Sequence, residues 1–565
     1  MKAAAALAAL ALAVPAAVGA DATAVGIGYI CGAEHDSTPQ AGATGAASAV
    51  MLQGVGNGAS PADTANREAQ AWYNEGLNLY HAFNHNEAIA AFAKAAALDP
   101  NCALCEWGVA LSLGPTLNYG VTADQTALAR THAERARKLV KAGDARAEAL
   151  AEAMLVRYGK AADRDMLYAK AMDAVARRYP ADDEIADLTA HALMLPGRGE
   201  DAANVSRALE LIKGVLARHP DDTAAIHYYI HATEFAGRPA EALPYAERLA
   251  RLAPGASHLV HMAAHTLMHV GRYEQVAVVD AEALKVDADT EKRLGYAGPL
   301  SSQMYYLHNY TFGLAGALMA GDSRLALKYA DHADVAFPAG DQSPVALPAG
   351  VSRVESPANR RATADARSLV AYGRYAPAKA LALAERPGDP RVIRIYRHYA
   401  RGEAFAARDD AAGVRAEAAA VAALGAEAAK ANESGNANLA EIAGGVLSGR
   451  AALLDHQPAK AAELFAAAAE KQEKVFPVAR NFDPPPWWYP VRRSLAAADL
   501  AAGKPGDAVR EARASLKDWP QDALALRVLS QAQAKQGHAD AAQKAMAEAK
   551  RAWRGDLAKV SLNLT

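Results

Sequence analysis

Residues 69 to 100 carry a pattern of small and large side chains that constrains the fold more than any other feature of the chain. Small residues stand where two packed helices would cross, and larger residues fill the space between them. The pattern comprises Trp72, Gly76, Tyr80, Ala88, Phe92, Ala95 and Pro100. These spacings are typical of a repeat of about 34 residues that contains two antiparallel helices. One such pair cannot bury its apolar face alone, so the pattern predicts a stack of helix pairs.

The length and composition of the chain favour the same architecture. A single core stops growing at about 250 to 300 residues, whereas this chain has 565. Hydrophobic residues make up 52% of the sequence and aromatic residues only 6%, so small side chains such as alanine dominate. Small side chains favour close stacking of helices over a few large cores. The formal net charge is −3 and no basic stripe with interleaved aromatic residues occurs, so we expect no nucleic-acid partner.

The pattern around Trp72 resembles the tetratricopeptide repeat along its whole length. This resemblance implies an all-α solenoid in which antiparallel helix pairs form a superhelix. Further units are marked by glycines between helices and prolines between repeats, namely Gly237, Pro254, Gly271, Gly321, Pro338, Gly503, Pro520 and Gly537. The segments 122–220 and 358–480 are helical by periodicity but keep only a degraded signature. We therefore predict an irregular array that runs through most of the chain.

Four prolines between residues 337 and 357 interrupt the helical pattern. We interpret this stretch as a linker loop between two solenoid halves. The N-terminal solenoid, with the histidines described below, is predicted over residues 67–336. The C-terminal tetratricopeptide-like solenoid is predicted over residues 358–565.

The first 20 residues have the layout of a cleavable signal peptide, because Lys2 precedes an apolar run and small residues follow up to Ala20. We expect cleavage near Ala20 and a mature protein that is periplasmic or secreted. Residues 21–66 are rich in Gly, Ala, Ser and Thr without a helical stripe, and we predict a flexible arm there. No later segment offers about 18 uninterrupted apolar residues, so stable membrane insertion is not expected.

Histidines recur at equivalent positions in consecutive repeats. The tetratricopeptide resemblance places these positions on the first helix of each pair, where they face the concave side of the superhelix. Successive first helices carry His227, His231 and Glu234, then His258, His261, His265 and His269, then His308. At about 100° per residue, each set occupies one face of its helix. The sequence therefore predicts facing stripes of imidazoles on the concave surface.

Imidazoles four residues apart on a helix lie about one turn apart, so both can reach one metal ion. Neutral imidazoles with a carboxylate nearby suit transition metals, whereas calcium and magnesium sites need more oxygen ligands. Zinc or copper is the predicted cofactor, and Met262 and Met268 favour copper slightly. The predicted core ligands, which should converge on one point, are His227, His231, His261 and His265. The predicted secondary ligands are His258, His269, His308 and Glu234.

Two alternative interpretations use the same side chains. In the first, the protein is an interaction scaffold whose concave groove binds a partner peptide through imidazoles and tyrosines. In the second, it is a metal-dependent hydrolytic or redox enzyme, with Glu234 as the catalytic base on a metal-bound water. A single histidine on a helix is usually only a packing residue. The presence of six histidines between residues 227 and 269 is what favours a metal site.

Cys102 and Cys105 form a C-x-x-C pair near a predicted helix N-terminus, where the helix dipole lowers the pKa of a thiol. A redox or soft-metal role is one interpretation of this pair. The other is a passive role as two small buried residues or a structural disulfide. The sequence shows no strand before the pair, as a thioredoxin-like site would require, and this favours the passive role.

Several longer strings resemble a family of exported bacterial tetratricopeptide proteins. They are FNHNEAIAAFAKAAALDPNCALCEWGVALSLGP, HYYIHATE, HLVHMAAH, HNYTF and PPPWWYPVRRSL. The resemblance implies export and a common role for the histidine-rich strings, and it leaves the activity open. Members of this family carry a further histidine where this chain has Thr311, and others around the position of Asn57. This chain therefore lacks histidines that the resemblance associates with a catalytic sphere.

Overall fold

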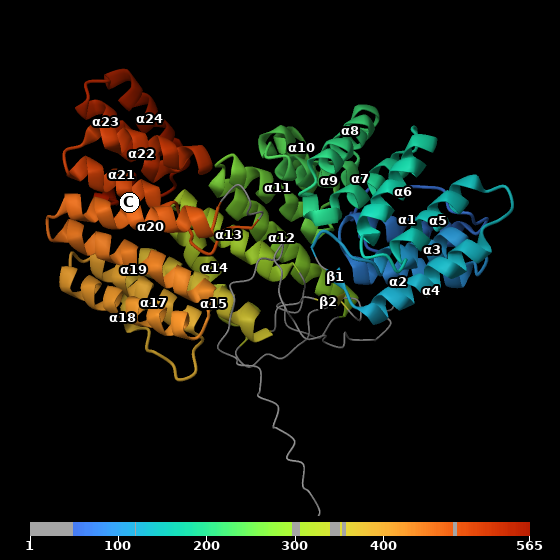
Figure 1. Cartoon of the computed structure of the whole chain (residues 1–565), viewed down its shortest axis with the longest axis horizontal. Helices are drawn as coiled ribbons and strands as arrows, with labels where there is room; N and C mark the ends of the chain where they lie inside the picture. The colour runs from blue at the N-terminus through green and yellow to red at the C-terminus, as the bar shows by residue number, and fades with distance from the viewer. Residues whose placement is uncertain (1–48, 119, 296–304, 339–350, 353–356, 478–482) are drawn as a thin grey trace, which may run out of the picture.

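The computed structural model describes residues 49–118, 120–295, 305–338, 351–352, 357–477 and 483–565. Over these residues the chain is a succession of antiparallel α-helix pairs that follow one another along the molecule (Figure 1). This arrangement confirms the predicted all-α tetratricopeptide solenoid. No helix in the described part is long and apolar enough to cross a membrane. The predicted signal peptide, residues 1–20, lies outside the described residues.

The N-terminal half contains the helices from α1 to α14. Their bounds are α1 Arg67–His81, α2 His85–Leu98, α3 Ala103–Ser112, α4 Ala123–Leu139, α5 Ala145–Arg157, α6 Arg164–Arg178, α7 Asp183–Met194, α8 Ala202–Arg218, α9 Thr223–Phe235, α10 Leu243–Leu252, α11 Ser257–His269, α12 Tyr273–Leu294, α13 Tyr306–Ala320 and α14 Ser323–Ala336. Short 3-10 turns, Pro196–Gly199 and Pro239–Ala242, connect α7 to α8 and α9 to α10. The varied connections confirm that the array is irregular.

The C-terminal half contains the helices from α15 to α24. Their bounds are α15 Pro357–Tyr375, α16 Pro377–Ala382, α17 Arg391–Ala406, α18 Ala411–Lys430, α19 Ser434–Leu454, α20 Pro458–Val475, α21 Val491–Ala501, α22 Pro505–Asp518, α23 Ala523–Lys535 and α24 Ala539–Ala552. Two 3-10 turns, Leu557–Lys559 and Leu562–Leu564, follow the last helix. The predicted linker over 337–357 lies largely outside the described residues. Within it, β2 (Val351–Ser352) pairs antiparallel with β1 (Gly120–Val121).

The repeat signature has a direct packing explanation at Phe92. This ring is fully buried on α2 and lies against a glycine on each neighbouring helix. A Cβ atom on Gly76 of α1 would fall 2.7 Å from the Phe92 ring, and a Cβ atom on Gly108 of α3 would fall closer still. The small residues therefore let three helices approach one aromatic ring.

Replacing Gly108 by alanine is therefore expected to destabilise the N-terminal half by about 1–3 kcal/mol, because the new methyl group overpacks the site. Gly214 of α8 provides a matched control, since the nearest atom to its added Cβ is the flexible Arg218 Nη1 at 3.6 Å. There, alanine should be neutral or stabilise the helix by up to about 1 kcal/mol. Chemical denaturation of the two variants measures the difference, and equal midpoints would contradict the packing explanation.

Residues 49–66 correct the prediction of a flexible arm over 21–66. Leu52 and Val55 are buried, and the Leu52 N–H donates to Glu75 Oε1 at 2.7 Å. Asn57 reaches α9, where its amide donates to the Asp221 carbonyl at 2.8 Å. Polar side chains of neighbouring helices thus satisfy the backbone of a glycine-rich segment that has no helical stripe of its own. Residues 21–48 lie outside the described part of the chain.

The C-terminal repeats fold back onto the N-terminal half. The backbone of Gly271, at the turn before α12, lies against the backbone of Pro520 after α22. The Arg554 N–H donates to the Ala320 carbonyl at 2.9 Å, and the Arg554 guanidinium also pairs with Glu274. These contacts bring the loop that starts at Asp483 next to α13.

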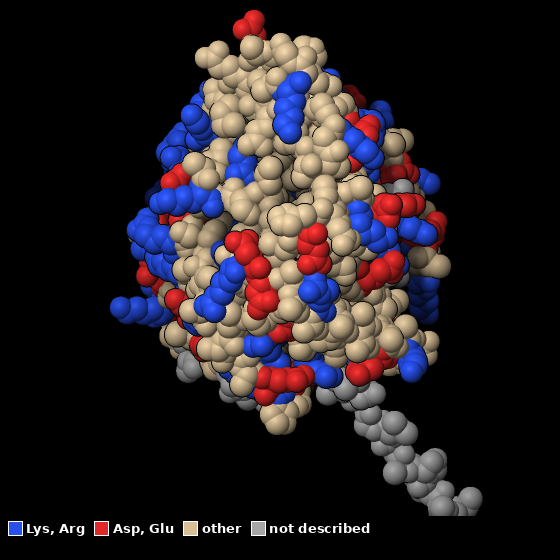
Figure 2. Space-filling model, turned by 90° about the vertical axis from the view of Figure 1, so that its left-hand side faces the viewer, with Lys and Arg blue, Asp and Glu red and all other residues tan. Residues whose placement is uncertain are grey.

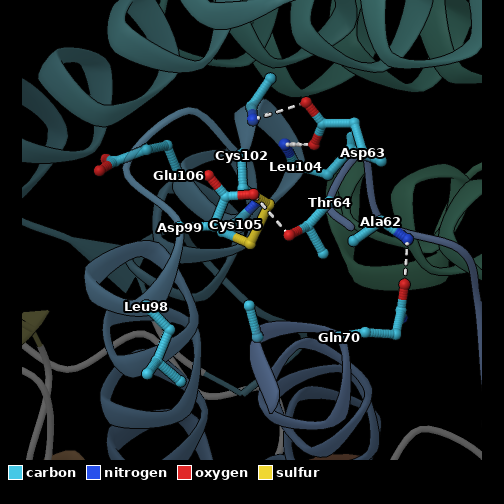
Figure 3. The surroundings of a disulfide bond; sticks show 12 residues. Ala62, Asp63, Thr64, Gln70, Leu98, Asp99, Cys102, Leu104, Cys105 and Glu106 are labelled. Carbon is cyan, nitrogen blue, oxygen red and sulfur yellow. Dashed lines mark hydrogen bonds between the residues drawn. A yellow bond between two sulfur atoms is a disulfide. The ribbon is translucent and has the colours of Figure 1, made fainter. Parts of the chain in front are cut away.

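Cys102 and Cys105 are joined by a disulfide at the start of α3, and both residues are fully buried (Figure 3). The Asp63 carboxylate beside them accepts hydrogen bonds from the N–H groups of Ala103 and Leu104, both at 2.9 Å. This carboxylate satisfies donors in the first turn of the helix. The buried disulfide and its surroundings are those of a structural bond, as the passive interpretation predicts.

Candidate metal centre

Three neighbouring first helices bring the predicted histidines together. Helix α11 contacts α9 on one side and α13 on the other, so a stripe on each helix faces the next stripe. The imidazoles of His227, His231, His258, His261, His265 and His308 are buried, as is the Glu234 carboxylate. His269 keeps 20% of its side chain exposed. The stripes are therefore present, but inside the protein and not on an open groove.

The structure divides the histidines into two groups and does not gather the predicted core ligands at one point. We call His227, His231 and His258 the first triad, and His261, His265 and His308 the second triad. Within each triad, one ligand atom per residue lies within 4.8 Å of the others. The predicted quartet of His227, His231, His261 and His265 is split between them. Two residues predicted as secondary ligands, His258 and His308, complete the triads.

The two triads are built in the same way. Each consists of two imidazoles four residues apart on one first helix and one imidazole from the first turn of the next first helix. The first triad joins α9 to α11, and the second joins α11 to α13. The offset between consecutive helices places a first-turn side chain opposite the preceding i, i+4 pair. Helix α13 has Thr311 and Ala315 at the pair positions, so the series ends there.

In the second triad a carboxylate lies behind each imidazole. His261 Nδ1 lies 2.6 Å from Asp280 Oδ1, His265 Nδ1 lies 3.0 Å from Glu234 Oε1, and His308 Nδ1 lies 2.9 Å from Asp483 Oδ1. The opposite nitrogen, Nε2, is buried in all three residues and has no hydrogen-bond partner among the residues that the structure describes. Metal-ligating histidines show this arrangement, in which a carboxylate fixes the ring and the other nitrogen holds the ion.

The protonation states in the second triad follow from burial and from these carboxylates. Burial and the neighbouring imidazoles lower the pKa of His261 well below 6.5. Burial also lowers the pKa of His265, but the Glu234 carboxylate outweighs this effect and raises it above the usual value. Burial raises the pKa of Asp280 well above its usual value. A neutral His261 ring is the form that ligates a metal ion.

Two of the three carboxylates were missed by the sequence analysis. Asp280 lies on the buried face of α12, with Val276, Ala277 and Ala283 at helical spacing, so an acidic residue on an apolar stripe was a visible signal. Asp483 stands in a proline-rich loop after α20, and nothing local to it indicates a role. Its place behind His308 depends on the return of the C-terminal repeats to the N-terminal half.

In the first triad, the three Nε2 atoms converge closely. His227 Nε2 lies 3.2 Å from both His231 Nε2 and His258 Nε2. His227 Nδ1 donates to the His81 carbonyl at 2.6 Å, and His231 Nδ1 lies 3.7 Å from Glu234 Oε2. Burial, with contributions from neighbouring imidazoles, lowers the pKa of His227 and His258 well below 6.5. Both rings are therefore neutral, as metal ligation requires.

Aromatic rings fill the space around both triads and explain why the imidazoles are buried. Phe83 stacks on His258 with ring centroids 5.0 Å apart, and Tyr305 covers the same ring at 4.4 Å. Phe312 lies 4.9 Å from His261 and 4.7 Å from His265. The prediction that these imidazoles line an open groove is wrong, because side chains of the arriving loops and helices occupy that space.

One pocket reaches the second triad from the surface. His265 and His269 of α11 form part of its wall, and Asp483, Trp488 and Trp519 of the C-terminal half form another part. Glu234, the predicted catalytic residue, lies behind this wall with Oε1 3.5 Å from His269 Nε2. This pocket, lined by α11 and the C-terminal half, therefore offers one approach to the site.

The sequence matches no protein-family model and no curated protein. Among solved structures, a human IFIT1 dimer with m7Gppp-AAAA is similar at 11% identity over 86% of this chain and 94% of its own, with a TM-score of 0.31. A structure of Naa15/Naa10 bound to HypK-THB is similar at 13% identity over 85% of this chain and 63% of its own, with a TM-score of 0.22. These values are too low to carry an argument about function.

Proposed function

We propose that this protein binds a transition metal ion through the imidazoles of the second triad. The observation that carries the proposal is the set of three buried Nε2 atoms that have no hydrogen-bond partner in the described part of the chain, each on a ring whose Nδ1 lies within 3.0 Å of a carboxylate oxygen. A buried polar atom left unpaired costs about 1–3 kcal/mol. One ring nitrogen from each of the three imidazoles lies within 4.8 Å of the others, which is consistent with a shared ligand.

The donor set supports a borderline or soft cation. Three imidazoles with carboxylates behind them suit zinc, and an ion held by three protein ligands keeps one position for water or substrate. Copper also accepts imidazole ligands. We place zinc first because these three ligands leave the position expected of a reactive zinc site, and copper second.

Export is part of the proposal. The charged and apolar start of the sequence supports a cleaved signal peptide, and the Cys102–Cys105 disulfide is compatible with an oxidising compartment. The metal would then be acquired in the periplasm or outside the cell.

Protein purified from its native compartment without added metal is expected to carry zinc or copper at one equivalent or more. Elemental analysis measures the ratio of metal to protein, and N-terminal sequencing of the same sample checks for cleavage near Ala20. An His261→Gln, His308→Gln variant should lose the metal of the second triad because two of its three ligands are gone. Only trace metal in the unmodified protein would overturn the proposal.

A metal-dependent enzyme is the second candidate, and the pocket beside His265 favours it. An ion in the second triad would lie next to a wall that reaches the surface, so a small substrate could approach its open position. The proposed catalytic role of Glu234 has a direct test. Since its carboxylate is 3.0 Å from His265 Nδ1, a Glu234→Gln variant that keeps its metal but loses activity would support a base, and loss of both would support a positioning residue.

A scaffold that binds a protein or peptide is the remaining alternative, since helical repeats carry such partners in general. Figure 2 shows basic and acidic side chains interspersed over the face formed by the C-terminal repeats. This face therefore has no patch of a single charge sign that would attract an oppositely charged partner. The buried imidazoles would not be the contact residues in that case.

A further inference from the structure

We infer that the first triad is a second metal site, so that the protein holds a pair of ions linked by Glu234. The inference rests on the proposed function of the second triad and extends it. The first triad has different surroundings, and the argument for it is independent of the carboxylates described above.

Hydrogen bonds alone do not explain the close contacts between the ring nitrogens of the first triad. The His81 carbonyl can only accept a hydrogen bond, so the proton of neutral His227 is on Nδ1. His227 Nε2 then has a single lone pair in the plane of the ring. Yet His231 Nε2 and His258 Nε2 both lie 3.2 Å from it. One lone pair cannot accept two well-directed hydrogen bonds, whereas a cation between the three nitrogens accepts electron density from each.

The distances fit such a cation. Four ligand atoms about 2.0–2.1 Å from a tetrahedral zinc ion lie about 3.3–3.4 Å from one another. The 3.2 Å separations from His227 Nε2 to His231 Nε2 and His258 Nε2 are close to this edge length.

The ring of His227 is held in this orientation by a chain of contacts. Its Nδ1–H is fixed by the carbonyl of His81, and the His81 ring is itself held by the Tyr228 hydroxyl and by Glu184 Oε1, both at 2.9 Å. All these side chains except Glu184 are buried. A positioned ligand ring with a supported backbone partner is what a metal site requires.

The repeat architecture makes the two sites equivalent by construction. The His227, His231 pair and the His261, His265 pair occupy equivalent positions in consecutive repeats. His258 and His308 are likewise equivalent. An arrangement that holds an ion in one repeat therefore recurs in the next. The sites differ in access, because His265 of the second triad lines the pocket while no residue of the first triad does.

Glu234 connects the two sites. Its Oε1 lies 3.0 Å from His265 Nδ1 in the second triad, and its Oε2 lies 3.7 Å from His231 Nδ1 in the first. One carboxylate thus contacts a ligand of each proposed ion, so both ions depend on it.

Metal stoichiometry tests the inference. The full chain is stripped with a chelator, titrated with zinc, and its bound metal is measured after removal of free zinc. We expect two equivalents in the unmodified protein. His227→Gln with His258→Gln should leave one, and His261→Gln with His308→Gln should also leave one. His332→Gln is the matched control, since this imidazole bonds to the Tyr306 hydroxyl outside both triads, and it should keep two.

The outcomes separate the inference from the proposed function. One equivalent in the unmodified protein, lost only with the His261 and His308 changes, would overturn the second site and leave the proposed function standing. No bound zinc or copper in the unmodified protein would overturn both. Because the unmodified protein already gives a decisive count, a variant that fails to fold does not remove the test.

A second pair of variants tests the link. Asp280 bonds to His261 of the second triad, so Asp280→Asn should weaken zinc binding at the second triad by about 10–100-fold and spare the first. Glu234→Gln should weaken binding at both. Competition with a chromogenic chelator resolves the two affinities. Equal effects of the two variants on the first triad would contradict a shared role for Glu234.

Discussion

Zinc added to the metal-free protein is expected to raise the temperature of its first unfolding transition by several degrees. A ligand that binds only the folded state at about 100 times its Kd contributes about 2.7 kcal/mol per site. The triads lie inside the N-terminal half, where α9, α11 and α13 contact one another in turn. Metal that joins these three helices should therefore stabilise the repeats that carry them.

Removal of one ligand from each triad should abolish this response. The change is His231→Ala together with His265→Ala, and the measurement is the difference in unfolding temperature with and without zinc. The absolute stability of the variant is not the readout, because loss of two buried side chains also leaves cavities. An His332→Ala control should respond as the unmodified protein does. A zinc response that survives the double change would show that the metal binds elsewhere.

The second large effect concerns the contact between the two halves. An alanine at Gly271 would place its Cβ atom against the backbone oxygen of Pro520, which cannot move aside as a flexible side chain can. We expect Gly271→Ala to undock the C-terminal repeats, with overpacking of about 1–3 kcal/mol added to the backbone strain. Limited proteolysis and calorimetry should show separate unfolding of the two halves.

Gly237 is a closely matched control for this change. It occupies the same turn one repeat earlier and also has a positive φ, +67° against +77° at Gly271, but its added Cβ would meet nothing within 4 Å. Gly237→Ala should thus show the backbone strain alone.

If the halves separate in Gly271→Ala, Asp483 leaves His308 and zinc binding at the second triad should weaken by about 10-fold or more. Identical behaviour of the two variants would contradict the docking explanation.

The sequence by itself determined the repeat and the location of the stripes. Helices α9 (Thr223–Phe235) and α11 (Ser257–His269) carry the histidines that the repeat register placed on first helices. Imidazoles at i and i+4 share a helix face whatever surrounds the helix, because the period of the backbone fixes their direction. The sequence also indicates Asp280, because this residue places a carboxylate on an apolar stripe of its helix.

Tertiary structure alone decided how the stripes are used. The division into two triads depends on the offset between neighbouring first helices, which is set by the packing of whole repeats and not by local periodicity. The burial of the imidazoles depends on Phe83, Tyr305 and Phe312, which come from separate connections and helices. Asp483 reaches His308 only because the superhelix brings the C-terminal repeats back to the N-terminal half. Each repeat is rotated slightly relative to its neighbour, and these contacts depend on that rotation accumulated over many repeats. No single stretch of sequence therefore specifies them.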